Sequence, residues 1–205
     1  MKRRNFIKTT AAGSAFLLTS GVYALNRSDD LPSGKKFCYQ SSREIPVAYD
    51  VDVVVIGGSM AGVAAAVQAS RAGAKVFLAA QEPYLGEDVC GTYRYWSEDN
   101  SITNTELGEK VFGEGLPTPM HVKRTLDNAL INNHIDFLYS SYVTDILTGS
   151  DSSPGGVVIS NRSGRQAIVA KTIIDATPRA LVARLAGAKF GTYPTGKQTF
   201  KFTVA

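Results

Sequence analysis

The clearest pattern in the chain is an apolar run that leads directly into a glycine-rich turn. Val51–Ile56 is almost wholly apolar, Gly57–Gly62 is made of small residues apart from Met60, and Val63–Ala72 carries alanine and valine at helical spacing. A strand buried on both faces is typical of such a run, and small residues allow a tight turn. The pattern predicts a strand–turn–helix unit, in which the helix N-terminus can bind a diphosphate.

The pattern after this unit predicts strands alternating with helices. The segment 81–118 is glycine-rich and aperiodic, so we expect a long irregular loop there. Three short alternating segments separated by turn residues predict a β-meander. In chain order, the other predicted elements are a helix at Met60–Arg71, a strand at Lys75–Ala79, a helix at Pro119–Asn133, a strand at Ile135–Tyr139, the meander at Tyr142–Leu147, Gly156–Ser160 and Gln166–Ala170, a separate buried strand at Thr172–Ala176, a helix at Leu181–Ala186 and a new strand at Thr199–Val204.

The N-terminus has the features of an export leader. Arg3 and Arg4 form a twin-arginine pair, and an apolar stretch, Thr9–Ser20, follows that is too short for a membrane span. Small residues at Val22 and Ala24 predict cleavage after Ala24. We therefore expect a twin-arginine signal peptide at 1–24, a linker at 25–48, export machinery as a partner, a periplasmic or other extracytoplasmic location and no stable membrane anchor. Export in the folded state suits a protein that acquires a cofactor beforehand.

The net charge of +4 at pH 7 comes from the leader, because the four basic residues of 1–24 account for the excess of 22 Lys and Arg over 18 Asp and Glu. A neutral mature chain gives no reason to expect nucleic-acid binding. The two cysteines, Cys38 and Cys90, could pair in an oxidising compartment, and the sequence leaves this open. His121 and His134 are not at metal-ligand spacing, so we expect no metal site.

Four segments in this order resemble the N-terminal FAD-binding part of FAD-dependent oxidoreductases of the glutathione-reductase-like superfamily. The resemblance extends from about Tyr49 to Phe190 and is carried by Gly57–Gly62, Pro83–Asp88, Tyr142–Thr144 and Thr172–Thr177 followed by Leu185–Ala188. It implies an α/β fold, a Rossmann-like parallel sheet with helices and an inserted three-stranded β-meander. It also implies a FAD-binding domain at 49–190, with 191–205 beginning a substrate domain that the chain lacks, as in a fragment of a longer enzyme.

The resemblance also implies which residues contact FAD. The glycine turn would line the pyrophosphate, the loop after the second strand would pass over the ribose and ribitol, Val143 would meet the adenine, and Ala176 and Thr177 would approach the flavin side. The implied cofactor-binding residues are Gly57, Gly58, Ser59, Met60, Ala61, Gly62, Glu82, Leu85, Gly86, Val143, Ala176 and Thr177. No catalytic acid, base or nucleophile is evident, which is typical of enzymes whose cofactor carries the chemistry.

The sequence departs from the family pattern at four positions. Ser59 replaces the second glycine of the turn, Ala80 stands where an acid usually bonds the ribose hydroxyls, and Glu82 is the nearest substitute. Glu87 interrupts a glycine pair, and Pro178 replaces a later glycine and removes an N–H donor. The first hypothesis is an oxidoreductase in which FAD accepts a hydride from a small organic substrate. The alternatives are a non-catalytic nucleotide-binding or interaction module, which these departures motivate, and an NAD-dependent dehydrogenase domain, against which the meander argues.

Overall fold

The structure is a computed structural model that describes residues 42–96, 105–113, 115–149, 154–192 and 194–197. Apart from Ser42, these residues belong to one compact unit, Arg43–Ala205. The predicted leader, most of the predicted linker, Cys38 and the strand predicted at Thr199–Val204 lie outside the described residues. In the described part, no helix is long and apolar enough to cross a membrane.

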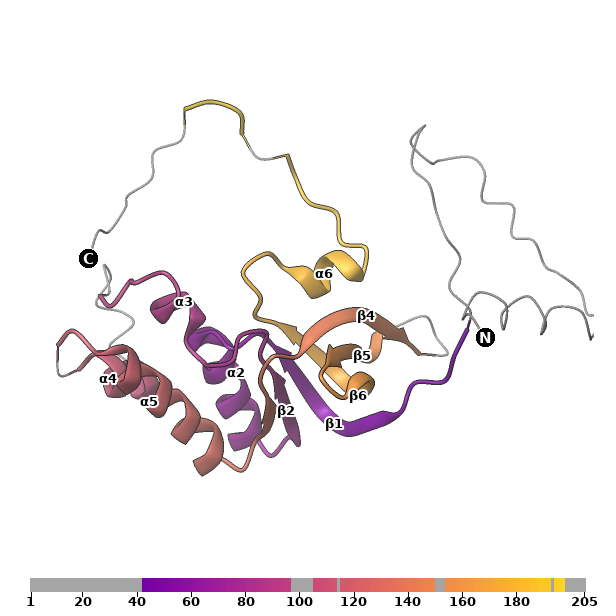
Figure 1. The fold of residues 1–205 in the computed structure, drawn as a ribbon, viewed down its shortest axis with the longest axis horizontal. Coiled ribbons are helices and arrows are strands. Elements are labelled where there is room, and N and C mark those ends of the chain that lie inside the picture. The colour runs from indigo at the N-terminus through magenta and orange to yellow at the C-terminus, as the bar shows by residue number, and fades with distance from the viewer. Residues whose placement is uncertain (1–41, 97–104, 114, 150–153, 193, 198–205) are drawn as a thin grey trace, which may run out of the picture. The chain divides into compact units, whose positions relative to one another are not determined.

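Strands and helices alternate along the first part of the chain, and the antiparallel strands come later (Figure 1). The elements are β1 (Val47–Ile56), α2 (Met60–Arg71), β2 (Val76–Ala79), α3 (Glu87–Cys90), α4 (Glu106–Phe112), α5 (Pro119–Asn132), β3 (Asp136–Leu138), β4 (Tyr142–Thr148), β5 (Pro154–Asn161), β6 (Gly164–Asp175) and α6 (Leu181–Leu185).

The strands form one sheet in the order β3-β2-β1-β6-β5-β4. The strands β3, β2, β1 and β6 pair in parallel, whereas β4, β5 and the first half of β6 form an antiparallel meander. This arrangement confirms the predicted α/β, Rossmann-like fold with an inserted three-stranded meander. Because β2 and β6 flank β1 on opposite sides, the strand order reverses at β1, and ligands bind beside such a reversal in open α/β sheets.

One long strand replaces two predicted ones. The segments predicted as the last meander strand and as a separate strand at Thr172–Ala176 are both parts of β6. Its first half pairs with β5, and its second half continues along β1 to the register Ile56–Asp175. The charged Lys171 does not end the strand, because its side chain stays exposed and its Nζ bonds Asp52 Oδ1 at 2.6 Å. The second half is also less buried than predicted, since Lys171 and Thr172 are exposed.

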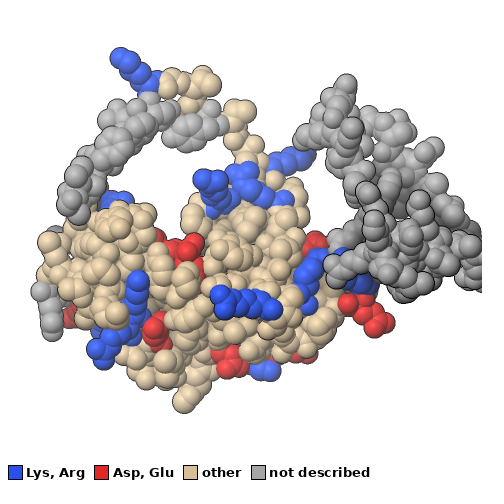
Figure 2. Space-filling view, viewed as in Figure 1, with Lys and Arg blue, Asp and Glu red and all other residues tan. Residues whose placement is uncertain are grey.

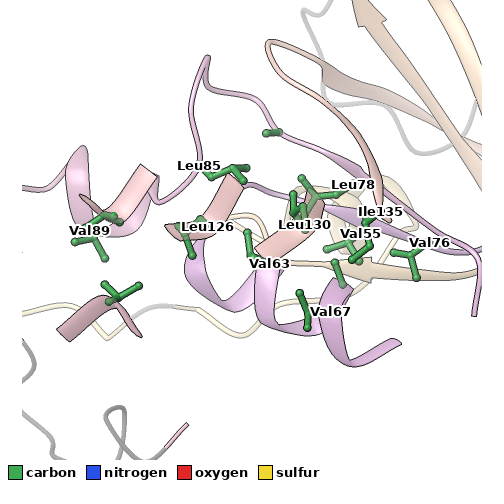
Figure 3. Close-up of a cluster of buried hydrophobic side chains, with 14 of the residues drawn as sticks. Val55, Val63, Val67, Val76, Leu78, Leu85, Val89, Leu126, Leu130 and Ile135 are labelled. Atoms are coloured by element: carbon green, nitrogen blue, oxygen red, sulfur yellow. The ribbon is translucent and has the colours of Figure 1, made fainter. Parts of the chain in front are cut away.

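The sheet has a hydrophobic core on each face. Alternate residues of β1 divide between them, so that Val55 packs on the helical side while Val54 and Ile56 pack against the meander. Figure 3 shows the helical side, where side chains of α2, α5, the strands and the loop after β2 meet. The fully buried residues there include Val63, Leu78, Leu85, Leu126 and Leu130. The apolar run of β1 therefore predicted its burial on both faces correctly.

The segment predicted as an irregular loop at 81–118 contains two short helices, α3 and α4. The side chain of Thr105 caps α4 by accepting the N–H of Gly108 at 3.0 Å. The sequence did not predict these helices, because four and seven residues are too few to show a helical spacing of hydrophobic residues.

Candidate cofactor-binding site

The glycine turn between β1 and α2 is packed against backbone atoms at two positions, where a side chain cannot fit. Gly57 has a φ of +117°, and a Cβ atom there would lie 2.5 Å from the carbonyl oxygen of Ala176. A Cβ atom at Gly62 would lie 2.3 Å from the carbonyl oxygen of Gly57. The first glycine thus allows the tight turn and the last allows α2 to approach it, which are the roles of these glycines in dinucleotide-binding turns.

Ser59 lies at the middle glycine position and its side chain is directed into the protein. It is only 7% exposed. Its Oγ accepts the N–H of Gly62 at 3.1 Å and donates to the carbonyl oxygen of Ala176 at 3.3 Å. Ser59 is therefore the N-cap of α2. Because its hydroxyl proton is already used, the donors that the turn offers to a ligand are backbone N–H groups.

The end of β6 lies against this turn. The N–H of Ala176 donates to the carbonyl oxygen of Ile56 at 2.7 Å, which extends the pairing of the two strands. Thr177 follows, and its hydroxyl donates to Asp175 Oδ1 at 2.7 Å. The other oxygen of Asp175 accepts the N–H of Ala183 at 3.0 Å, so this carboxylate anchors α6. The turn, Ala176 and Thr177 are thus brought together at the carboxyl ends of two neighbouring parallel strands.

The loop after β2 is pinned to the same turn. The N–H of Gly86 donates to the carbonyl oxygen of Gly58 at 2.7 Å. Gly86 has a φ of +80°, and a Cβ atom there would lie 2.9 Å from the side chain of Val122 on α5. The side chain of Leu85 is fully buried in the helical core. Among the residues predicted to bind the cofactor, Leu85 could therefore contribute only its backbone.

The position after β2 holds a buried alanine where an acid would bond ribose hydroxyls. Ala80 is fully buried, and its N–H donates to the carbonyl oxygen of Leu138 at 2.8 Å. Two residues later, the backbone carbonyl of Glu82 accepts the N–H of Ser140 at 3.3 Å. Glu82 lines a cavity beside the turn. Val143 lies farther along, on β4, opposite Ile159.

A cavity of about 510 Å³ opens beside the turn. It lies between the loop after β2 and the segment that follows β6, and it is lined by Gln81, Glu82, Tyr84, Glu87, Asp88, Gly91, Thr92 and Pro178. Figure 2 shows acidic side chains at the hollow near α3. A larger cavity of about 690 Å³ lies between α2, α4 and α5, but no residue of the predicted site lines it. The smaller cavity is therefore the one placed to receive a ligand of the turn.

The carboxylate groups of this cavity affect one another. Burial, followed by repulsion from Asp88 and Glu82, raises the pKa of Glu87. One oxygen of Glu87, Oε2, is buried and has no hydrogen-bond partner among the described residues. Asp88 is solvent-exposed, yet partial desolvation by the surrounding atoms raises its pKa, against the opposing effect of hydrogen bonds from backbone N–H groups. The cavity is thus more acidic in composition than a diphosphate site requires.

The sequence did not predict a role for Asp88, which contacts the turn directly. The N–H of Met60, the first residue of α2, donates to both carboxylate oxygens of Asp88, at 3.1 and 3.2 Å. An acid two residues after Gly86 was visible in the sequence, but nothing local showed that it reaches a helix that begins 28 residues earlier.

A protein-family model, FAD dependent oxidoreductase, matches residues 52–201. The chain belongs to this family. The predicted cofactor, FAD, is therefore confirmed at the level of the family. None of the curated proteins compared with this sequence matches it.

Two solved structures share the fold of this flavoprotein family member. THI4 from Thermovibrio ammonificans superposes with a TM-score of 0.53 at 17% identity, over 68% of this chain and 64% of that one. A geranylgeranyl bacteriochlorophyll reductase-like protein from Thermoplasma acidophilum superposes with a TM-score of 0.52 at 19% identity, over 69% of this chain and 43% of that one. The chain thus spans less than two thirds of either structure.

The glycine turn fits the diphosphate of FAD. Gly57 and Gly62 place no side chain over the N-terminus of α2, the Ser59 hydroxyl caps it from the protein side, and the carboxylate of Asp88 bonds the N–H of Met60. Cys90 lies nearby as a buried free thiol whose Sγ donates to the carbonyl oxygen of Pro119 at 3.7 Å. Among the described residues, no group of three or more His, Cys, Asp or Glu side chains is arranged to hold a metal ion.

Proposed function

We propose that this chain is the FAD-binding portion of an oxidoreductase in which FAD accepts a hydride from a small organic substrate. The observation that carries the proposal is the glycine turn at the carboxyl end of β1, packed against the end of β6 where the strand order reverses. This is the place where open α/β sheets bind dinucleotides. The family match supports the cofactor and the class of reaction.

The residues of the site would each hold a different part of the cofactor. Backbone N–H groups of Met60 and Ala61, at the positive end of the α2 dipole, would bind the diphosphate. Glu82 would accept hydrogen bonds from ribose hydroxyls in place of the missing acid at Ala80. Gly86 would bring the loop over the ribitol. The backbone of Val143 would contact the adenine, and that of Ala176 and Thr177 the flavin side of the diphosphate.

FAD supplies the electron-accepting chemistry when it is bound, so this part of the enzyme needs no catalytic side chain. The fold would position the cofactor and exclude water from its diphosphate. The substrate would be bound chiefly by a further domain, because the chain spans 64% of THI4 and 43% of the reductase-like protein. The described residues would bind FAD and need not contact the substrate.

A second candidate function is a non-catalytic nucleotide-binding or interaction module. It is favoured by the buried Ala80 at the ribose position and by the carboxylate of Asp88 at the N–H of Met60. Both features lower the expected affinity for FAD, since a hydrogen bond to a charged partner contributes about 1.5–3 kcal/mol.

FAD titration of the full chain distinguishes the two functions. We expect bound flavin to give a visible spectrum that survives gel filtration. The Gly57→Ala variant should lose the spectrum, because a Cβ atom would displace the turn from Ala176. Gly191→Ala is the matched control, since a Cβ atom there meets open space. A folded wild-type protein that stays colourless with excess FAD would favour the module.

We further propose that the protein is exported by the twin-arginine route after FAD has bound. The support is the pair Arg3 and Arg4, the short apolar stretch after it and the small residues before the expected cleavage point at Ala24. The double variant Arg3→Lys, Arg4→Lys should leave the protein in the cytoplasm, whereas Lys8→Arg should not, as cell fractionation would measure. Equal export of both variants would contradict the proposal.

A further inference from the structure

The N-terminus of α2 already has an anionic partner within the protein. Met60 donates its backbone N–H to both oxygens of the Asp88 carboxylate, at 3.1 and 3.2 Å. A carboxylate at this end of a helix is stabilised by the free N–H groups and by the helix dipole. Asp88 therefore occupies the donor and the field that would bind a phosphate group.

The backbone of Asp88 is held firmly in this place. On one side, Gly86 is bonded to Gly58 of the turn and packed against α5. On the other side, the hydroxyl of Thr92 donates to the carbonyl oxygen of Asp88 at 2.6 Å, and Val89 is buried in the helical core. Because the backbone is anchored on both sides of Asp88, the loop holds the carboxylate beside the N–H of Met60. The carboxylate can move away from this N–H only if the Asp88 side chain rotates.

One N–H group cannot serve two anions. A phosphate oxygen at hydrogen-bond distance from Met60 would have to occupy the space that the two carboxylate oxygens fill. The N–H of Gly62 is already bonded to the Ser59 side chain, so of the first N–H groups of α2 only that of Ala61 remains, directly beside the Asp88 carboxylate. Two negative groups at this distance would also repel each other.

We propose that Asp88 is an internal occupant of the diphosphate-binding turn, and that its carboxylate must leave the N–H of Met60 before the diphosphate of FAD can bind. Asp88 thus stabilises the empty turn and lowers the affinity for FAD. This inference rests on the proposed FAD site. According to this inference, Asp88 controls the affinity of the turn for FAD.

The test measures binding of FAD, ADP and adenosine to the full chain and its variants. Asp88→Ala removes the competing group, and Asp88→Asn keeps its shape but removes its charge. Both should bind FAD and ADP more tightly than the wild type, by about 10- to 100-fold, because the ligand no longer displaces a charged hydrogen bond. Adenosine, which lacks a diphosphate, should bind equally to all. Asp88→Ala should also lower the urea midpoint of the ligand-free protein, because the N-terminus of α2 loses the carboxylate that accepts the N–H of Met60.

Glu87→Gln is the matched control, because Glu87 is the neighbouring acid of the same cavity and does not bond the helix. Its affinity for FAD should stay close to that of the wild type. An equal gain in Glu87→Gln and Asp88→Asn would show a general charge effect and overturn the inference. Equal FAD affinity in the wild type and both Asp88 variants would overturn it while the proposed function stands. Folded proteins that bind no FAD in any form would overturn both.

Discussion

The hydroxyl of Ser59 joins two segments that lie 117 residues apart, because it donates a hydrogen bond to the carbonyl oxygen of Ala176. The hydroxyl oxygen of Ser59 also accepts the N–H of Gly62 and so caps α2. One hydroxyl thus holds the turn both to its own helix and to the end of β6. A serine at a position where glycine is usual has in this way become part of the structure that supports the turn.

The first prediction concerns this double role. Ser59→Ala should lower the free energy of unfolding by about 1–2 kcal/mol, since it removes an N-cap and a buried hydrogen bond. Thr118→Ala is the control, because Thr118 caps α5 by accepting the N–H of His121 and makes no comparable contact with a distant strand. Urea unfolding should show the larger loss for Ser59→Ala. A smaller loss than that of Thr118→Ala would contradict the role assigned to the Ala176 contact.

The second prediction tests the close approach of α2 to the turn. Gly62→Ala should lower the free energy of unfolding by about 1–3 kcal/mol, as overpacked sites do. The new Cβ atom would lie 2.3 Å from the backbone oxygen of Gly57 and 3.2 Å from the Cβ of Ala176. Backbone cannot move aside as a side chain can. Gly191→Ala should change the value by no more than about 0.5 kcal/mol in the same measurement.

The third prediction concerns the carboxylate that anchors α6. Asp175→Ala should lower the free energy of unfolding by about 3 kcal/mol, because the carboxylate accepts hydrogen bonds from Thr177 and Ala183. Asp175→Asn should lose less, since its amide oxygen can still accept. Hydrogen exchange at the amides of α6 would report the release directly. Exchange in Asp175→Ala at the wild-type rate would show that other contacts anchor this helix.

The fourth prediction is a pH dependence. Hydrogen bonds from Arg71, then from Lys110, lower the pKa of Glu106 from 4.5 to about 2. A carboxyl group whose folded pKa is depressed stabilises the protein above its unfolded pKa, and this stability is lost as the pH falls from about 4.5 towards 2. Both ion pairs of Glu106 are solvent-exposed, so their contribution to the free energy of unfolding is small and is screened by salt. NMR titration should find the low pKa, and Glu106→Gln should unfold with a weaker pH dependence between these values.

The fold could be predicted where the pattern is local. The apolar run of β1, the glycine turn and the spacing of α2 specify a strand, a turn and a helix between Val47 and Arg71, and the structure contains all three. The short helices α3 and α4 were missed because helices of four and seven residues show too few turns for a hydrophobic period. The break between Ala170 and Thr172 was wrongly predicted, because β6 stays paired with β1 across this point and only its pairing with β5 ends, at Val169, which leaves no mark in the sequence.

The candidate site also has residues that local sequence predicts and residues whose role depends on packing. The positions that need glycine, Gly57 and Gly62, are evident from their order in the turn, since a tight turn before a helix restricts the residue types that fit. The inward direction of the Ser59 side chain and the burial of Leu85 were not evident, because each depends on what packs against it. The same holds for Asp88, whose partner is the backbone of another element.

The sequence alone determined that this protein has a dinucleotide-type βα turn, because strand, glycines and helix are contiguous and their local geometry follows from residue type. Only the tertiary structure decided what surrounds that turn. Ser59 meets Ala176 and Met60 meets Asp88 because the sheet brings the carboxyl ends of β1, β2 and β6 to one edge. Contacts between residues far apart in the chain arise from packing, and no local pattern records them.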